Sequence, residues 1–261
     1  MSIENSRFPT PVAVNIIPNP LRLKTAEIET DILEDHNIVG YNSRDIRARP
    51  FNLLRTQILK EMRNKNWKLL GITSATPEAG KSFLAANLAV ALAQLPEIRV
   101  FLFDLDLRRA SLAEKFGIDG DIGLTQFLDG SVDNLLDIGR QLTNLNLTLF
   151  PCYHARVNSA EILSGERFQT LIDAMRALPD DVVIICDLPP AFANDDAMAI
   201  IQQLDSYLFV IEEGITTKAQ VRDAMQLFAP APCIGTVLNR YQPNTSENFG
   251  YGGKYDRYYG D

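Results

Sequence analysis

The sequence predicts an α/β fold, with a mostly parallel β-sheet and helices on both of its faces. Six short apolar segments alternate with longer segments whose apolar residues recur at helical spacing. Strands formed from such continuously apolar segments would be buried on both faces, which is typical of parallel sheets covered by helices. The strands are predicted within residues 68–75, 99–107, 147–153, 181–189, 206–213 and 233–241.

The pattern along the sequence divides the chain into an N-terminal arm, a main domain and a C-terminal tail. A helix is predicted from about Pro50, and others near residues 81–95, 160–178, 193–204 and 217–229. Residues 1–45 carry prolines, mixed charge and no sustained periodicity, so we expect a flexible N-terminal arm there. The main domain is then predicted over residues 46–243, and a C-terminal tail over residues 244–261.

Composition excludes several classes of protein. A hydrophobic share of 46% in 261 residues is ordinary for a globular protein and excludes a wholly disordered chain. The net charge of -8 argues against general nucleic-acid binding, which needs a basic surface. No apolar run approaches the roughly 20 residues of a membrane span, and the N-terminus does not resemble a secretory signal. We therefore expect a cytoplasmic protein.

A phosphate-binding loop is predicted between the segment at 68–75 and the helix that follows it. The sequence ATPEAGKS matches GxxxxGK[ST], except that Ala75 replaces the first glycine. The backbone of such a loop and the start of its helix hold phosphates, the lysine neutralises them, and the serine ligates magnesium. Gly80, Lys81 and Ser82 supply these functions here, and Ala75 fits if its φ is negative.

Two of the predicted strands end in aspartates. Asp104 and Asp106 close the segment at 99–107, and alternation would place both on the same side of the strand, beside the loop. Asp187 ends the segment at 181–189, where a carboxylate can hold a magnesium-bound water. Because ligands of such sheets bind at the carboxyl ends of the strands, we expect these groups around the phosphates.

Together these motifs resemble the Walker A, A′ and B motifs of the bacterial tyrosine kinases of capsule and exopolysaccharide synthesis. The three motifs are SATPEAGKS, FLFDLDLRR and IICDLPP, and the resemblance extends over residues 46–261 through GLTQFLDGSVD, SAEILSGERFQTLI, NDDAMAI and GTVLNR. It implies a P-loop NTPase fold of the deviant-Walker, partitioning-ATPase-like branch. It also implies an ATP- and Mg²⁺-dependent protein-tyrosine kinase.

The resemblance also implies roles for individual residues. Lys81 would bind the β- and γ-phosphates, and Ser82 and Asp187 would organise Mg²⁺. Asp104 and Asp106 would complete the metal site and orient or deprotonate the incoming phenol. The implied nucleotide contacts are Thr76, Pro77, Glu78, Ala79, Gly80, Lys81, Ser82, Phe83 and, more loosely at the adenine, Asn239 and Arg240.

The tail GYGGKYDRYYGD carries four tyrosines, and the resemblance identifies them as autophosphorylation sites. They are Tyr251, Tyr255, Tyr258 and Tyr259. Each phosphotyrosine would add about -1.5 to -2 charge, so phosphorylation should expel a tail docked in a neighbour's active site. The implied partners are further copies of the chain, a membrane polysaccharide chain-length regulator that activates it at the inner face of the membrane, and a tyrosine phosphatase.

Three positions depart from related patterns and leave alternatives open. Glu78 stands where these kinases usually carry glycine, and of the assembly-helix motif Glu-x-x-Arg-x-x-Arg only Arg55 matches. The dimeric partitioning and septum-placement ATPases share the fold and motifs, but they carry a lysine where this chain has Thr76, and they lack a tyrosine tail. A nucleotide-binding regulatory module without catalysis is the other alternative.

Overall fold

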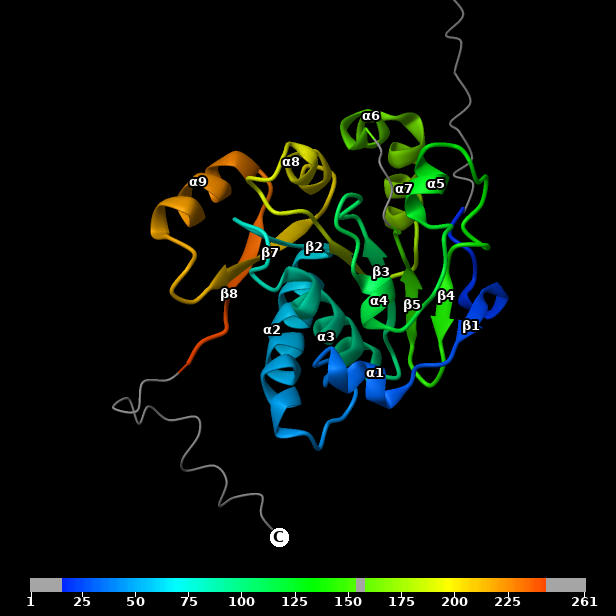
Figure 1. Cartoon of the computed structure of the whole chain (residues 1–261), viewed down its shortest axis with the longest axis horizontal. Helices are drawn as coiled ribbons and strands as arrows, with labels where there is room; N and C mark the ends of the chain where they lie inside the picture. The colour runs from blue at the N-terminus through cyan, green and yellow to red at the C-terminus, as the bar shows by residue number, and fades with distance from the viewer. Residues whose placement is uncertain (1–15, 154–157, 243–261) are drawn as a thin grey trace, which may run out of the picture.

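The computed structural model describes residues 16–153 and 158–242. In that part of the chain eight strands form one sheet, in the order β1-β4-β5-β3-β6-β2-β7-β8 (Figure 1). Neighbouring strands are parallel everywhere except between β4 and β5. The strands are β1 (Lys24–Ala26), β2 (Leu69–Ser74), β3 (Arg99–Asp104), β4 (Arg140–Leu142), β5 (Leu147–Phe150), β6 (Val182–Asp187), β7 (Ser206–Glu212) and β8 (Cys233–Asn239).

Helices cover both faces of the sheet (Figure 1). One layer consists of α1 (Thr30–Asp35), α2 (Arg49–Lys65), α3 (Lys81–Ala93) and α4 (Leu112–Lys115). The other layer consists of α5 (Leu124–Leu128), α6 (Ser159–Ser164), α7 (Glu166–Arg176), α8 (Asp196–Ile201) and α9 (Lys218–Phe228). Two short 3-10 turns, η1 (Pro20–Arg22) and η2 (Ile46–Ala48), precede α2.

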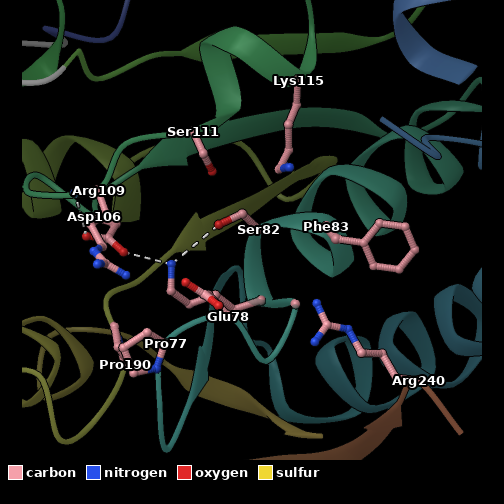
Figure 2. A pocket seen from close by; sticks show the side chains of 12 residues that line it. Pro77, Glu78, Ser82, Phe83, Asp106, Arg109, Ser111, Lys115, Pro190 and Arg240 are labelled. Carbon is pink, nitrogen blue, oxygen red and sulfur yellow. Dashed lines mark hydrogen bonds and ion pairs between the residues drawn. The ribbon is translucent and has the colours of Figure 1, made fainter. Parts of the chain in front are cut away.

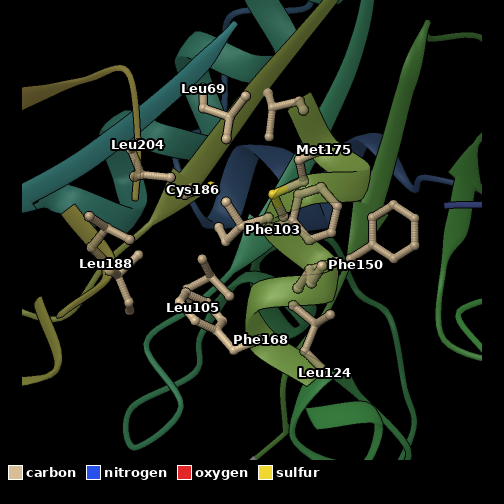
Figure 3. Packing of buried hydrophobic residues seen from close by; sticks show 14 of the residues in the cluster. Leu69, Phe103, Leu105, Leu124, Phe150, Phe168, Met175, Cys186, Leu188 and Leu204 are labelled. Carbon is tan, nitrogen blue, oxygen red and sulfur yellow. The ribbon is translucent and has the colours of Figure 1, made fainter. Parts of the chain in front are cut away.

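The central strands are buried on both faces because their side chains alternate between the two layers. In β3, Phe101 and Phe103 belong to the core under α5–α9, while Val100 and Leu102 belong to the core under α1–α4. Phe103 stacks on Phe150 of β5 with ring centroids 4.5 Å apart (Figure 3). The predicted α/β fold class is therefore confirmed, and so is the reason for expecting a parallel sheet.

All six predicted strands and each predicted helical segment contain the expected element. The segment at 160–178 forms two helices, because the chain is extended at Gly165 (φ -79°, ψ 160°) between α6 and α7. The elements that the sequence did not predict are short ones: β1, β4, α1, α4 and α5.

Residues 16–45, which we expected to belong to a flexible arm, pack against the domain. Strand β1 lies at one edge of the sheet and pairs in parallel with β4, and Leu33 of α1 and Ile38 are buried in the core under α1–α4. Apolar burial and edge pairing thus hold this segment on the domain, although its elements are too short to show a period. Residues 1–15 lie outside the described part of the chain.

Asn87 of α3 anchors the segment that leads from α1 to α2. Its buried side chain accepts hydrogen bonds from the backbone N–H groups of Val39 (2.8 Å) and Gly40 (3.2 Å), and donates one to the carbonyl of Asn37 (3.1 Å). A Cβ on Gly40 would lie 2.5 Å from the backbone carbonyl oxygen of Asn87, so only glycine permits this close approach of the two segments. The same helix that follows the phosphate loop therefore fixes the N-terminal segment.

Candidate active site

The phosphate loop connects the end of β2 to the start of α3. Ala75 is fully buried and does not take a positive φ, so the alanine at the first glycine position fits without strain. Gly80 has a φ of 94° directly before α3, and a Cβ there would lie 2.1 Å from Nδ2 of Asn239. Glycine is therefore required at position 80 but not at position 75.

Lys81 is buried at the first position of α3, and its ammonium group lies at the acidic strand ends. Its ammonium nitrogen lies 2.7 Å from Oδ2 of Asp106, 3.8 Å from Oδ1 of Asp187 and 3.4 Å from the Ser82 hydroxyl. Burial alone would lower the pKa of Lys81, but Asp187 and Asp106 outweigh it and raise the pKa. The ammonium group is therefore charged where a polyphosphate would meet the start of α3.

Asp104 and Asp187 face each other at the ends of the adjacent strands β3 and β6. Oδ2 of Asp104 accepts hydrogen bonds from the N–H groups of Ser111 and Leu112, both at 3.0 Å. Within the described residues no hydrogen bond reaches Oδ1 of Asp104 or either carboxylate oxygen of Asp187. Burial raises the pKa of Asp104 to about 8, and it also raises the pKa of Asp187.

These oxygens, which accept no hydrogen bond from the described residues, fit a hard cation such as Mg²⁺, which prefers oxygen ligands and retains several waters. No group of three or more His, Cys, Asp or Glu side chains in the described chain is arranged to hold a metal by itself. Asp106 is held by Lys81 and by the Arg109 N–H, and Asp104 is held by the start of α4. The protein thus offers part of a magnesium site, to which phosphate oxygens and water would add the remainder.

A pocket of about 480 Å³ lies between the phosphate loop and the segment from Asp106 to Lys115 (Figure 2). Of the predicted nucleotide contacts, those that line it are Pro77, Glu78, Gly80, Lys81, Ser82, Phe83 and Arg240. Thr76, Ala79 and Asn239 do not line it. Of the predicted catalytic carboxylates, Asp106 lines the pocket, while Asp104 and Asp187 are fully buried beside it.

Comparisons with known proteins agree with this geometry. Residues 70–252 match the family model for the CobQ/CobB/MinD/ParA nucleotide binding domain. Tyrosine-protein kinase YwqD of Bacillus subtilis is 30% identical over 219 residues, which cover 82% of this chain and 90% of that protein. This chain belongs to the bacterial tyrosine kinase family.

Some members of the bacterial tyrosine kinase family are longer than this chain, which then matches only a part of them. Tyrosine-protein kinase ptk of Acinetobacter johnsonii is 32% identical over 78% of this chain, but the match spans 28% of that kinase's length. The kinase domain of the Escherichia coli tyrosine kinase ETK superposes with a TM-score of 0.72 at 26% identity, covering 84% of this chain and 85% of that one. The P-loop fold expected from the motifs is thereby confirmed.

The two residues expected at the adenine have other contacts in this kinase-family chain. Nδ2 of Asn239, at the end of β8, donates a hydrogen bond to the carbonyl of Ala79 in the phosphate loop (2.8 Å). The guanidinium of Arg240 pairs with the carboxylate of Glu212, a buried residue at the end of β7, and Arg240 also lines the pocket. Asn239 therefore holds the phosphate loop through its backbone, and of these two residues only Arg240 lines the pocket.

Sequence reasoning missed four residues of the pocket, namely Arg109, Ser111, Lys115 and Pro190. Within the described residues no ion pair engages Arg109 or Lys115, so both cations are available to an anionic ligand. Arg109 is the last residue of the quoted FLFDLDLRR motif and could have been included on that ground. Lys115 ends a helix of four residues, α4, which no periodicity could have indicated.

Two expectations concern other parts of the chain. The four tail tyrosines, Tyr251, Tyr255, Tyr258 and Tyr259, lie outside the described residues. Among residues 16–153 and 158–242, no helix has the length and apolar character that crossing a bilayer requires.

Proposed function

We propose that this chain is an ATP-dependent protein-tyrosine autokinase that phosphorylates tyrosines of its own C-terminal tail. One observation carries the proposal: a charged, buried Lys81 at the start of α3 contacts the carboxylates of Asp106 and Asp187 at the wall of a pocket of about 480 Å³. Membership of the bacterial tyrosine kinase family supplies the reaction class. The tail offers Tyr251, Tyr255, Tyr258 and Tyr259 as acceptors.

In this proposal Lys81 leaves Asp106 when ATP arrives and binds the β- and γ-phosphates instead. Ser82 and Asp187 would hold Mg²⁺, with Asp104 beside them on the neighbouring strand, and the bound ion would supply neutralising charge for phosphoryl transfer. Because Asp106 lines the pocket whereas Asp104 is fully buried beside it, we assign the acceptance of the phenol proton to Asp106. Arg109 and Lys115, across the pocket, add positive charge near the phosphates.

We further propose that the kinase acts with a membrane partner in exopolysaccharide or capsule synthesis, and that it forms homo-oligomers. The resemblance of its motifs supports this context. The assembly helix of the family corresponds to the start of α2, where only Arg55 matches. Arg55 donates a hydrogen bond to the carbonyl of Ala91 in the same chain (2.9 Å), so an inter-subunit contact through this residue would share or replace that bond.

Mapping phosphotyrosine by mass spectrometry, after incubation with ATP and Mg²⁺, tests the kinase proposal. We expect phosphate on the tail tyrosines and a loss of about 100-fold or more in Lys81→Ala, which removes a charge-stabilising group. Lys60→Ala, a change at an exposed position of α2, is the matched control and should leave labelling unchanged. A candidate activator segment from a membrane partner should increase labelling of the wild-type chain.

Because Lys81 neutralises buried carboxylates, the Lys81→Ala variant must first be shown to fold, by circular dichroism and thermal unfolding. ATP hydrolysis without tail labelling would contradict the autokinase and favour a partitioning-type ATPase. Nucleotide binding without either activity would contradict it as well, and would favour the regulatory module.

A further inference from the structure

Glu78 has a backbone conformation that favours glycine. Its φ is 65°, in the left-handed region, where a side chain is strained and glycine is not. The residue lies two positions before Gly80 in the phosphate loop and is exposed. The local backbone therefore does not explain why position 78 carries a side chain, whereas a role of the carboxylate would.

The carboxylate of Glu78 forms no ion pair with any residue that the structure describes. It lines the pocket together with Lys81 and Arg240, but Lys81 pairs with Asp106 and Arg240 pairs with Glu212. Figure 2 shows no interaction between Glu78 and another residue of the pocket, and no hydrogen bond or ion pair joins its carboxylate to any described residue. A negative charge thus stands at the wall where phosphates would bind.

We propose that Glu78 is a specificity-determining residue that makes this pocket reject metal-free polyphosphates and accept a nucleotide bound to a divalent cation. The inference rests on the proposed nucleotide function of the pocket. Repulsion between Glu78 and a ligand grows with the negative charge of the ligand. A divalent cation bound across the phosphates lowers that charge by two units, so it relieves most of the repulsion.

The cations of the pocket act against Glu78 but do not hide its contribution. When Lys81 turns from Asp106 to the phosphates, it attracts the metal-free nucleotide more strongly than the metal-bound one, and it leaves the carboxylate of Asp106 uncompensated. These groups are the same in the wild type and in Glu78→Gln, so the difference between the two chains isolates the charge of Glu78. Arg109 and Lys115 line the pocket from the β3–α4 region, whereas Glu78 belongs to the phosphate loop itself. Glu78 therefore adds its charge where the phosphates approach the backbone of the loop.

The test measures the affinity of the full chain for ADP, which is not turned over, by calorimetry in Mg²⁺ and in EDTA. Glu78→Gln removes the charge and keeps the size of the side chain. We expect it to tighten metal-free ADP binding about ten-fold and Mg²⁺–ADP binding much less, so that the preference for the metal complex falls. Glu97→Gln makes the same charge change at an exposed position of the loop between α3 and β3 and should alter neither affinity.

Two more variants separate charge from backbone conformation. Glu78→Ala should reproduce Glu78→Gln, whereas Glu78→Gly should show the same affinities and also a higher melting temperature. An unchanged preference in Glu78→Gln, or a change seen only in the glycine variant, would overturn the proposal. Failure of the wild-type chain to bind ADP under either condition would instead overturn the proposed nucleotide function.

Discussion

At the scale of single residues, the buried carboxyl pair of Asp104 and Asp187 makes the nucleotide-free protein sensitive to pH. Burial raises the pKa of Asp104 from an ordinary value near 3.8 to about 8. Between these two pH values the folded protein holds a proton that the unfolded chain has released. The free energy of unfolding should therefore fall as the pH rises from about 4 to about 8.

The variant Asp104→Asn tests this reasoning. Its amide oxygen can still accept the hydrogen bonds from Ser111 and Leu112, but it carries no charge at any pH. We expect it to stabilise the nucleotide-free protein by about 1–3 kcal/mol at high pH, where the wild-type carboxylate is buried and ionised. Near pH 5 the wild-type group is already protonated, so the gain should be small.

Urea unfolding at about pH 5 and about pH 8 measures the difference. Asp121→Asn, at an exposed loop position, is the control and should show no such pH dependence. An effect of Asp104→Asn that is equal at both pH values would contradict a raised pKa for Asp104. The loss of a Mg²⁺ ligand in the same variant should also weaken the stabilisation that Mg²⁺–ADP gives to the wild-type protein.

At the scale of secondary-structure elements, α3 serves two segments at once, since it begins at the phosphate loop and anchors the chain between α1 and α2 through Asn87. Replacing Asn87 with alanine leaves the N–H groups of Val39 and Gly40 without an acceptor in a buried position. We expect a loss of about 1–3 kcal/mol in the free energy of unfolding, measured by urea denaturation. Gln94→Ala, exposed at the end of the same helix, should cost much less.

Hydrogen exchange gives a second measure of the Asn87 contact. The amide protons of Val39 and Gly40 should exchange faster in Asn87→Ala, while those in the centre of β3 should keep their protection. Protection that is unchanged at residues 39–40 would mean that Asn87 does not hold this segment.

The elements that the sequence predicted correctly are those long enough to carry a pattern. Strands β3 and β6 each have six residues, and α2 has 17 residues with apolar positions at helical spacing. Strands β1 and β4 have three residues each, and β1 pairs with a segment far away in the sequence. Their formation depends on tertiary docking, which no local period reveals, so the N-terminal segment was expected to be a flexible arm.

At the scale of the whole molecule, the order of the strands creates the site. Strand β6 lies between β2 and β3, so the loop after β2 and the aspartates of β3 and β6 come from three adjacent strand ends. The sequence predicted these groups because their motifs end apolar strands. It did not predict that Lys81 would pair with Asp106, or that Asn239 would support the loop, because both contacts depend on the order of strands that are distant in the sequence.

The position of β8 has a consequence for kinetics. This last strand ends beside the phosphate loop, where Asn239 contacts Ala79 and Arg240 lines the pocket. The chain continues from there to the tail, and Tyr251 follows Gln242 by a span that covers at most about 30 Å when fully extended. A tyrosine tethered this close has an effective concentration in the millimolar range.

Tethering therefore makes reaction within one molecule competitive with reaction between molecules. We expect the initial rate of tail labelling per molecule to stay constant when the protein is diluted from the micromolar to the nanomolar range, as followed by phosphotyrosine immunoblotting. A rate per molecule that falls in proportion to the dilution would instead mean that each tail is modified by a neighbouring subunit. In that case the end of β8 would fix how far the tail can extend, and the arrangement of subunits would decide which active site modifies it.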